Sequence, residues 1–203
     1  APYNSFVTNL KTSGGKPLDP EKDFEGLERL KPEARKNIIG LQSQLWGETI
    51  KGPQMAEYYI LPKLTAFAET AWGKERPWEN ENNAVKRQQL MEEGWNEFAN
   101  RLGKTELPRL SRLFGGFNYR VPPPGGIVEE GMLKANVEYP GLNIRYTTDG
   151  SEPTAQSLLW KEPVPVSGDV RLKAFDAAGK SSHTISIKGF RSSDVPKVPV
   201  SNP

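Results

Sequence analysis

Two side chains that could bind a sugar lie close together in the stretch GLQSQLWGETI, residues 40–50. Trp46 ends a short apolar run, and Glu48 follows it by two positions. An indole face can cover the C–H surface of a pyranose ring, and a carboxylate can accept hydrogen bonds from two of its hydroxyl groups. A tryptophan of the core beside a solvated carboxylate would give the same pattern. Both interpretations are open on spacing alone.

Other kinds of chemistry are limited by two scarce residue types. The chain contains one histidine, His183, and no cysteine. A serine triad needs a histidine, most transition-metal sites use several, and thiolate zinc sites and disulfides need cysteine. His183 lies in a strand-like stretch near the C-terminus, where we expect a surface side chain. The sequence therefore predicts no cofactor, no metal site and no catalytic role for His183.

Charge and length restrict the partners and the number of domains. The 203 residues include 27 Lys and Arg against 25 Asp and Glu, scattered along the chain. Without basic tracts or a long apolar run, we expect neither a nucleic-acid partner nor a membrane-spanning segment, and no signal peptide is seen. The length fits one or two domains, and two are favoured.

The first half of the chain reads as a strand followed by helices. Residues 1–37 have no sustained periodicity, whereas residues 38–46, IIGLQSQLW, are typical of a buried strand interrupted by glycine. A helical period then runs through residues 51–76, with Pro53 in its first turn and a kink expected at Pro62. One strand cannot form a sheet, so the pattern favours a piece of a larger α/β fold over an independent small α+β domain.

A second helix is indicated by Met91, Trp95, Phe98 and Leu102, which repeat at helical spacing. Asn80 or Asn82 is expected to cap its start and Gly103 to end it, and a short third helical piece follows at residues 107–114.

The composition changes at YRVPPPGG, residues 119–126, which reads as a linker or the entry to a new fold. Beyond it the hydrophobic period becomes two, in MLKANVEY, NIRYTTDG, DVRLKAF and HTISIKGF. Turns about ten residues apart predict a small β-sandwich. The tail at residues 192–203 has little to bury and is expected to fray.

Residues 37–72 resemble the last strand and helix of the catalytic barrel in glycoside hydrolase family 20, the β-N-acetylhexosaminidases. The stretch IRYTTDGSEPT resembles the domain after the barrel in bacterial chitobiases. The resemblance implies an α+β chain: residues 1–117 as the C-terminal end of a (β/α)8 barrel, residues 118–191 as an immunoglobulin-like β-sandwich, and a tail at 192–203. The positions that match the barrel pattern are Gly40, Trp46, Gly47, Glu48, Pro62, Lys63, Ala66, Ala68, Glu69 and Trp72.

By this resemblance Trp46 lines the pocket for a terminal N-acetylglucosamine and Glu48 holds its O4 and O6 hydroxyls, while Glu69 and Trp72 are structural. The family cleaves with an adjacent Asp-Glu pair and the substrate's own acetamide. No Asp-Glu dipeptide occurs in this sequence. The adjacent acids Glu92-Glu93 and Glu129-Glu130 read as solvated. The resemblance implies that the chain supplies sugar-pocket residues but no catalytic ones.

The implied partners are an N-acetylglucosamine-containing oligosaccharide and a missing N-terminal part of the same enzyme, in the periplasm or outside the cell. A different class of function is a free-standing carbohydrate-binding or adhesion module centred on the β domain. In that case Tyr139, Tyr146 or Trp160 would be a stacking platform. The alternative is that these aromatics fill a small core and that Asp149-Gly150 is a hairpin turn.

Overall fold

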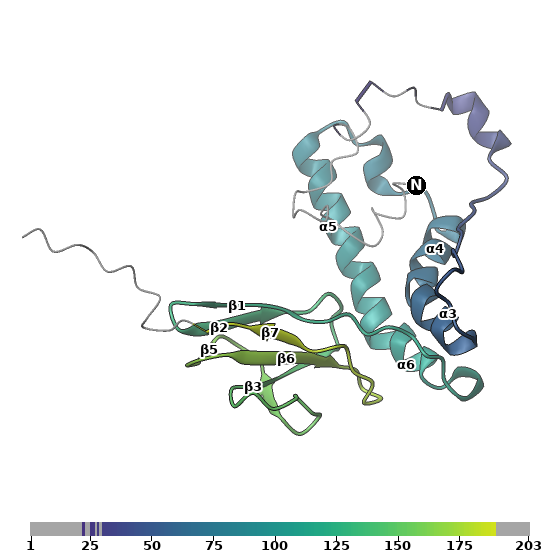
Figure 1. The fold of residues 1–203 in the computed structure, drawn as a ribbon. Coiled ribbons are helices and arrows are strands. Elements are labelled where there is room, and N and C mark those ends of the chain that lie inside the picture. Colours follow the sequence, from purple (N-terminus) through teal and green to yellow (C-terminus); the bar gives the residue numbers. More distant parts are fainter. Residues whose placement is uncertain (1–21, 23–24, 27, 29, 190–203) are drawn as a thin grey trace, which may run out of the picture. The chain divides into compact units, whose positions relative to one another are not determined.

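The computed structural model describes residues 22, 25, 26, 28 and 30–189. The rest of the N-terminal loop and the expected tail at 192–203 lie outside the described residues. The chain divides into two units, Ala1–Leu102 with Arg112–Tyr119, and Gly103–Ser111 with Arg120–Pro203. Helices and antiparallel sheets both occur (Figure 1), so the α+β class is confirmed.

Helices make up the regular structure of the first unit. The helical period predicted for residues 51–76 is confirmed, with Pro53 opening the first helix, and the break falls at Leu61 and Pro62 as expected. The ring of Pro62 removes a backbone donor, so a new helix starts after it. The elements are η1 (Pro32–Asn37), α3 (Pro53–Ile60), α4 (Lys63–Trp72), η2 (Pro77–Asn80) and α5 (Ala84–Arg101).

Helix α5 buries the face that its sequence predicts. Met91 and Phe98 are buried, as is Leu102 directly after the helix. The cap is Asn83, not Asn80 or Asn82: its side-chain oxygen accepts a hydrogen bond of 3.0 Å from the backbone N–H of Lys86. The chain continues through a π-helical turn, η3 (Leu102–Glu106), so Gly103 does not stop the helical path.

The strand predicted at residues 38–46 does not form. This segment has no assigned secondary structure, and no strand among the described residues pairs with it. Ile38, Ile39 and Leu41 are all exposed. The physical reason is that a strand needs neighbours for its backbone N–H and C=O groups and a surface to cover its apolar side chains.

The second unit consists mainly of two antiparallel sheets, one ordered β1-β2-β5 and the other β4-β3-β6-β7. The strands predicted from alternation are confirmed as β2, β3, β6 and β7, whereas β1, β4 and β5 were not predicted. The bounds are β1 (Gly125–Glu129), β2 (Met132–Asn136), β3 (Asn143–Thr147), β4 (Leu158–Trp160), β5 (Val164–Pro165), β6 (Val170–Phe175) and β7 (Ile185–Ile187).

The expected third helical piece at residues 107–114 is divided in two. Helix α6 (Leu107–Leu110) belongs to the second unit, and the single turn η4 (Leu113–Gly115) belongs to the first.

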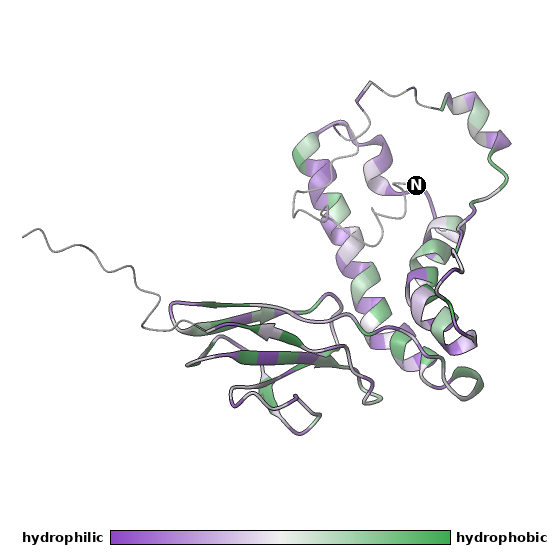
Figure 2. Ribbon diagram, in the orientation of Figure 1, coloured by the Kyte–Doolittle hydropathy of each residue, from purple (hydrophilic) through white to green (hydrophobic). Residues whose placement is uncertain are grey.

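Both sheets contribute to one core. Leu133 of β2, Ile144 of β3, and Val170 and Leu172 of β6 are buried together. Hydrophobic and polar residues alternate along β6, which Figure 2 shows as alternating bands. Alternation sends every second side chain into this core, so the unit closes its own apolar surface.

Strand β1 was missed because its glycines look like a turn. A Cβ atom at Gly126 would lie 2.5 Å from Leu172 Cδ1 and 2.8 Å from Ile187 Cδ1. Glycine at this position therefore leaves room for side chains of β6 and β7, and a larger residue would displace the methyl ends of Leu172 and Ile187. The true turn comes later, at Glu130 and Gly131, where both φ angles are positive. Such a two-residue loop suits the twist of a hairpin.

Trp78 and Gly94 lie in close contact within the helical unit. The indole of Trp78, in η2, is 8% exposed. A Cβ atom at Gly94 of α5 would lie 2.4 Å from Cζ3 and 2.9 Å from Cη2 of that ring. Gly94 thus gives up helix propensity so that the indole can lie against the α5 backbone.

We expect Gly94→Ala to lower the free energy of unfolding of the helical unit by about 1–2 kcal/mol, although alanine is the better helix former, because overpacking outweighs propensity. Thermal unfolding followed by far-UV circular dichroism measures this change. Asn96→Ala, at an exposed position of the same helix, is the control and should be neutral or slightly stabilising. Equal melting temperatures for Gly94→Ala and Asn96→Ala would contradict the close packing of Trp78 on Gly94.

Candidate functional site

Trp46 and Glu48 lie on the connection that leads into α3, and both are exposed. The side chain of Trp46 is 76% exposed. Glu48 lies in a turn closed by a hydrogen bond of 3.1 Å from Ile50 N–H to the Gly47 carbonyl. The segment therefore presents an aromatic face and a carboxylate to solvent.

Exposed apolar side chains are concentrated in the first unit. Besides the segment before Trp46, they include Leu64 and Trp72 of α4, the latter 82% exposed. The described residues leave Trp72 largely uncovered, so its expected structural role stays a prediction.

Glu69, the other residue expected to be structural, ties helix α4 to its neighbours. Its carboxylate pairs with Arg101 at the end of α5 and with Arg76 at 3.4 Å. Partial burial acts to raise the pKa of Glu69, but the hydrogen bond and charge of Arg101, with those of Arg76, hold it below its ordinary value of 4.5. This arrangement supports the structural interpretation of Glu69.

Arg76 makes two further contacts that fix the turn after α4. Its Nη2 donates a hydrogen bond of 2.9 Å to the Glu69 carbonyl, one of the last acceptors of the helix. Its guanidinium lies 5.8 Å from the centre of the Trp78 ring, within cation–π range. Arg76 therefore links Glu69 of α4 to Trp78, whose ring packs on α5.

Three residues of the motif TTDGSEPT, residues 147–154, are hydrogen-bonded to one another. The backbone N–H and hydroxyl of Ser151 both donate to Asp149 Oδ1, at 2.9 and 2.6 Å, and the Thr147 hydroxyl donates to the Ser151 carbonyl at 2.7 Å. The Ser151 hydrogen bonds hold the pKa of Asp149 below its ordinary value. Gly150 has a φ of 79°. The chain bends at Asp149-Gly150, but the connection from β3 to β4 continues to residue 157, so these two residues are not by themselves the hairpin turn that was expected.

The aromatics of the second unit lie in its core instead of forming a platform. Trp160 packs against the core cluster and its indole N–H donates to the Leu133 carbonyl at 3.2 Å. Tyr146 packs against the same cluster, and Tyr139 is 7% exposed. Burial raises the pKa of Tyr139, with Glu138 acting in the same direction. These positions favour the core interpretation over a stacking surface for sugars.

The remaining candidate groups are solvated as predicted. Glu92 and Glu93 are exposed and accept hydrogen bonds from Gln88 and Gln89 one turn earlier on α5. His183 is exposed. The described residues contain no group of three His, Asp or Glu side chains that could hold a metal ion. Within the same residues, every helix is too short or too polar to cross a membrane.

Two matches to known families divide the chain in the order that the sequence suggested. Residues 5–75 match the catalytic domain of glycosyl hydrolase family 20. Residues 106–185 match the chitobiase/beta-hexosaminidase C-terminal domain. In this order, a segment similar to the family 20 catalytic domain precedes a segment similar to the chitobiase/β-hexosaminidase C-terminal domain. The family 20 resemblance is thereby confirmed, and the family is one of glycoside hydrolases.

Similar proteins carry corresponding names. An N,N′-diacetylchitobiase of Vibrio harveyi is 34% identical over 164 residues, which cover 75% of this chain and 18% of that protein. A beta-hexosaminidase of Vibrio vulnificus is 30% identical over 58% of this chain and 16% of its own length. A beta-hexosaminidase of Porphyromonas gingivalis is 25% identical over 87% of this chain and 22% of its own length. The chain spans about a fifth of the length of these relatives.

Sequence reasoning missed where the C-terminal family match begins. The match starts at residue 106, and contacts assign Gly103–Ser111 to the second unit. A Cβ atom at Gly103 would lie 2.0 Å from the Pro140 carbonyl oxygen. The glycine thus lets the backbone approach the turn between β2 and β3, a contact that local periodicity does not reveal. The domain boundary expected at 118 stays a prediction.

We expect Glu69→Gln to lower the free energy of unfolding of the helical unit by about 1 kcal/mol at neutral pH, because the variant keeps the shape but loses two partly exposed ion pairs. Since the folded pKa of Glu69 lies below its ordinary 4.5, this stabilisation is present above 4.5 and disappears as the pH falls through the folded pKa. Glu97→Gln, an exposed position on α5, is the control for thermal unfolding measured at several pH values. Identical pH dependence in the two variants would exclude the ion pairs as the cause.

Proposed function

We propose that this chain is the C-terminal part of a β-N-acetylhexosaminidase. Such an enzyme removes terminal non-reducing N-acetylglucosamine or N-acetylgalactosamine from chitooligosaccharides or glycans, with retention of configuration. The observation that carries the proposal is the order of the two family matches, with the catalytic-domain segment at residues 5–75 followed by the C-terminal domain at residues 106–185. The names of the relatives, a chitobiase and hexosaminidases, support the substrate class.

In the proposed enzyme, residues 38–46 are the last strand of a (β/α)8 barrel and α3 and α4 belong to its outer layer. The support is physical: the segment has the apolar composition of a buried strand, yet Ile38, Ile39 and Leu41 are exposed. Neighbouring strands would cover these side chains and pair the backbone. The second unit, with two antiparallel sheets around one core, fits an immunoglobulin-like sandwich.

Trp46 and Glu48 are proposed to bind the terminal sugar. In a barrel, the segment directly after a strand lies at the face where substrates bind. Trp46 would cover the apolar side of the N-acetylglucosamine ring, and Glu48 would accept hydrogen bonds from its O4 and O6 hydroxyls. Their exposure, at 76% for Trp46, leaves both groups accessible to a ligand. Neither group is placed to break a bond, and both act by positioning the sugar.

The chemical step is proposed to depend on residues outside this chain. Family 20 enzymes are substrate-assisted: the acetamide of the substrate attacks the anomeric carbon while an acid protonates the leaving oxygen. An adjacent Asp-Glu pair orients the acetamide and donates that proton, and this sequence contains no Asp-Glu dipeptide. By this argument, the chain alone has a part of the sugar site without the groups that cleave.

Accordingly, we expect purified 1–203 to hydrolyse a chromogenic β-N-acetylglucosaminide no faster than the blank, because the acid/base and acetamide-orienting carboxylates are absent. The N,N′-diacetylchitobiase of Vibrio harveyi in the same assay is the positive control. Turnover that survives further purification, and that comes from this chain, would show that it holds catalytic groups of its own.

In the full-length enzyme, we expect Glu48→Gln to reduce kcat/KM roughly 10- to 150-fold and to raise KM. The loss of a charged hydrogen bond to a sugar hydroxyl costs on the order of 1.5–3 kcal/mol. Steady-state kinetics of the variant measure this change, with Glu97→Gln as a control at a distant exposed position. Unchanged kinetics for Glu48→Gln would remove this residue from the sugar site.

A further inference from the structure

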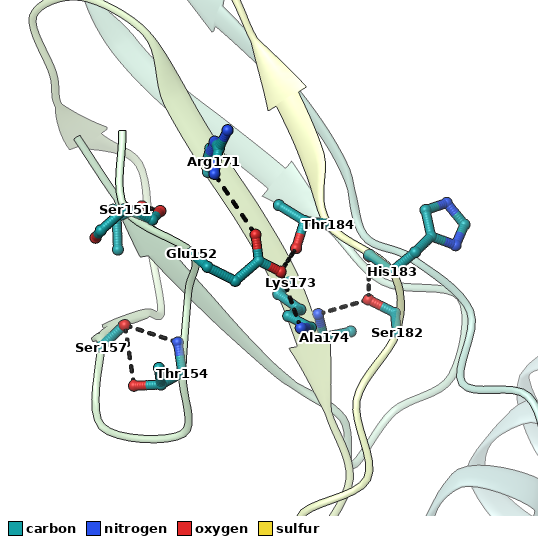
Figure 3. Close-up of polar contacts among 11 residues, drawn as sticks. Ser151, Glu152, Thr154, Ser157, Arg171, Lys173, Ala174, Ser182, His183 and Thr184 are labelled. Carbon is teal, nitrogen blue, oxygen red and sulfur yellow. Dashed lines mark hydrogen bonds and ion pairs between the residues drawn. The ribbon is translucent and has the colours of Figure 1, made fainter. Parts of the chain in front are cut away.

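The connection between β3 and β4 in the second unit, residues 148–157, is tied to the sheet by one carboxylate. Glu152 accepts hydrogen bonds from Lys173 Nζ at 3.0 Å and from the Thr184 hydroxyl, and its other oxygen lies 3.6 Å from Arg171. These partners are far from it in sequence, on β6 and just before β7. Figure 3 shows the carboxylate of Glu152 pointing at all three of them.

The other polar contacts of this loop are mostly local. Ser151 bonds with Asp149, and the Thr154 N–H donates to the Ser157 hydroxyl at 2.9 Å, so these bonds shape the loop without fixing it to the sheet. Arg145 of β3 donates to the Ser157 carbonyl at 3.0 Å, close to where β4 begins. Besides the buried ring of Pro153, Glu152 is therefore the principal tie between the middle of the loop and β6.

The face of the sheet beneath Glu152 is crowded with positive charge. Arg145 of β3 is directly opposite Lys173 of β6 in the register, and Arg171 is two residues away on the same side of β6. Like charges directly opposite each other destabilise a pair of strands. The carboxylate of Glu152 offsets this repulsion at Lys173, whose side chain is 18% exposed while that of Glu152 is 54% exposed.

We propose that Glu152 is a proton-controlled latch: as a carboxylate it holds the loop at residues 148–157 closed over β6, and when protonated it lets the loop open and uncovers Lys173. The charged groups that face it are Lys173 and Arg171, with Arg145 beside Lys173. The ring of His183 points away from Glu152 (Figure 3). The carboxylate of Asp149 accepts a hydrogen bond from the Ser151 hydroxyl.

The direction of the pH dependence follows from these contacts. The hydrogen bond from Thr184, then that from Lys173, with the charges of Lys173 and Arg171, hold the pKa of Glu152 below its ordinary value of 4.5. A carboxylate with a lowered folded pKa stabilises the closed loop above 4.5, and this stabilisation is lost as the pH falls through the folded pKa. The latch is thus closed at neutral pH and opens only in acid.

Amide hydrogen exchange of the full chain tests the latch, with protection factors used to remove the intrinsic pH dependence. At about pH 7 we expect Glu152→Gln to lower protection across residues 148–157 roughly two- to fivefold, the range produced by exposed charged pairs. As the pH is lowered through the folded pKa of Glu152, the protection of the wild-type loop should fall to that of the variant, because the carboxylate becomes protonated. Glu162→Gln, an exposed carboxylate between β4 and β5, should match the wild type at every pH.

Two results would overturn the latch. One is a Glu152→Gln loop that is as protected as the wild type at neutral pH. The other is a difference between them that persists in acid. If Glu152→Gln does not fold, Thr184→Val removes a single donor and should lower protection of the same loop at neutral pH by a smaller factor. An unchanged loop in that variant would equally exclude the latch.

Discussion

A β-strand is stable only when neighbouring strands bind its backbone N–H and C=O groups and other residues pack on its apolar face. The two units of this protein differ in whether they meet that requirement. The second unit meets it internally, because both sheets close over Leu133 and Leu172, and Gly126 leaves room for side chains of β6 and β7. In the first unit, residues 38–46 have the composition of a buried strand and remain exposed.

The proposed sugar site depends on the same requirement. Trp46 and Glu48 directly follow the uncovered segment, so their position relative to a substrate is only as fixed as that segment is. The helical unit does have order of its own, since Glu69, Arg76 and Trp78 connect α4 with α5. These contacts hold the C-terminal half of α4, and none of them involves the turn that contains Glu48. We therefore propose that sugar recognition and barrel closure are formed together, when the remaining catalytic-domain residues pack on this segment.

Local sequence patterns predicted those elements whose stability is local or whose faces are buried within the unit. Helix α5 followed from the spacing of Met91 and Phe98, and β6 followed from strict alternation. Strand β1 could not be predicted, because Gly125-Gly126 has the composition of a turn and is needed for a close approach that only the folded core reveals. The segment at 38–46 was predicted as a strand from its apolar composition. Composition shows that these residues are suited to a buried strand, but it does not show whether neighbouring strands are present.

The candidate site was predictable to a similar degree. The pairing of Trp46 with Glu48 gained meaning from the motifs around it, and the two family matches confirm the family that those motifs indicated. Motif and spacing could not tell that the residues at 147–154 bond to one another, that Trp160 donates to Leu133, or that Trp72 is uncovered. These outcomes depend on which surfaces meet in three dimensions.

The most direct test of the proposal that residues 38–46 await the rest of a catalytic barrel is amide hydrogen exchange of these residues, compared with that of β6 in the same chain. We expect residues 38–46 to exchange at nearly the rate of an unstructured peptide, while Val170–Phe175 is protected by the closed core of the second unit. Strong protection of residues 38–46 in the isolated chain would mean that the segment finds strand partners within it. That result would contradict the proposal that it awaits the rest of a catalytic barrel.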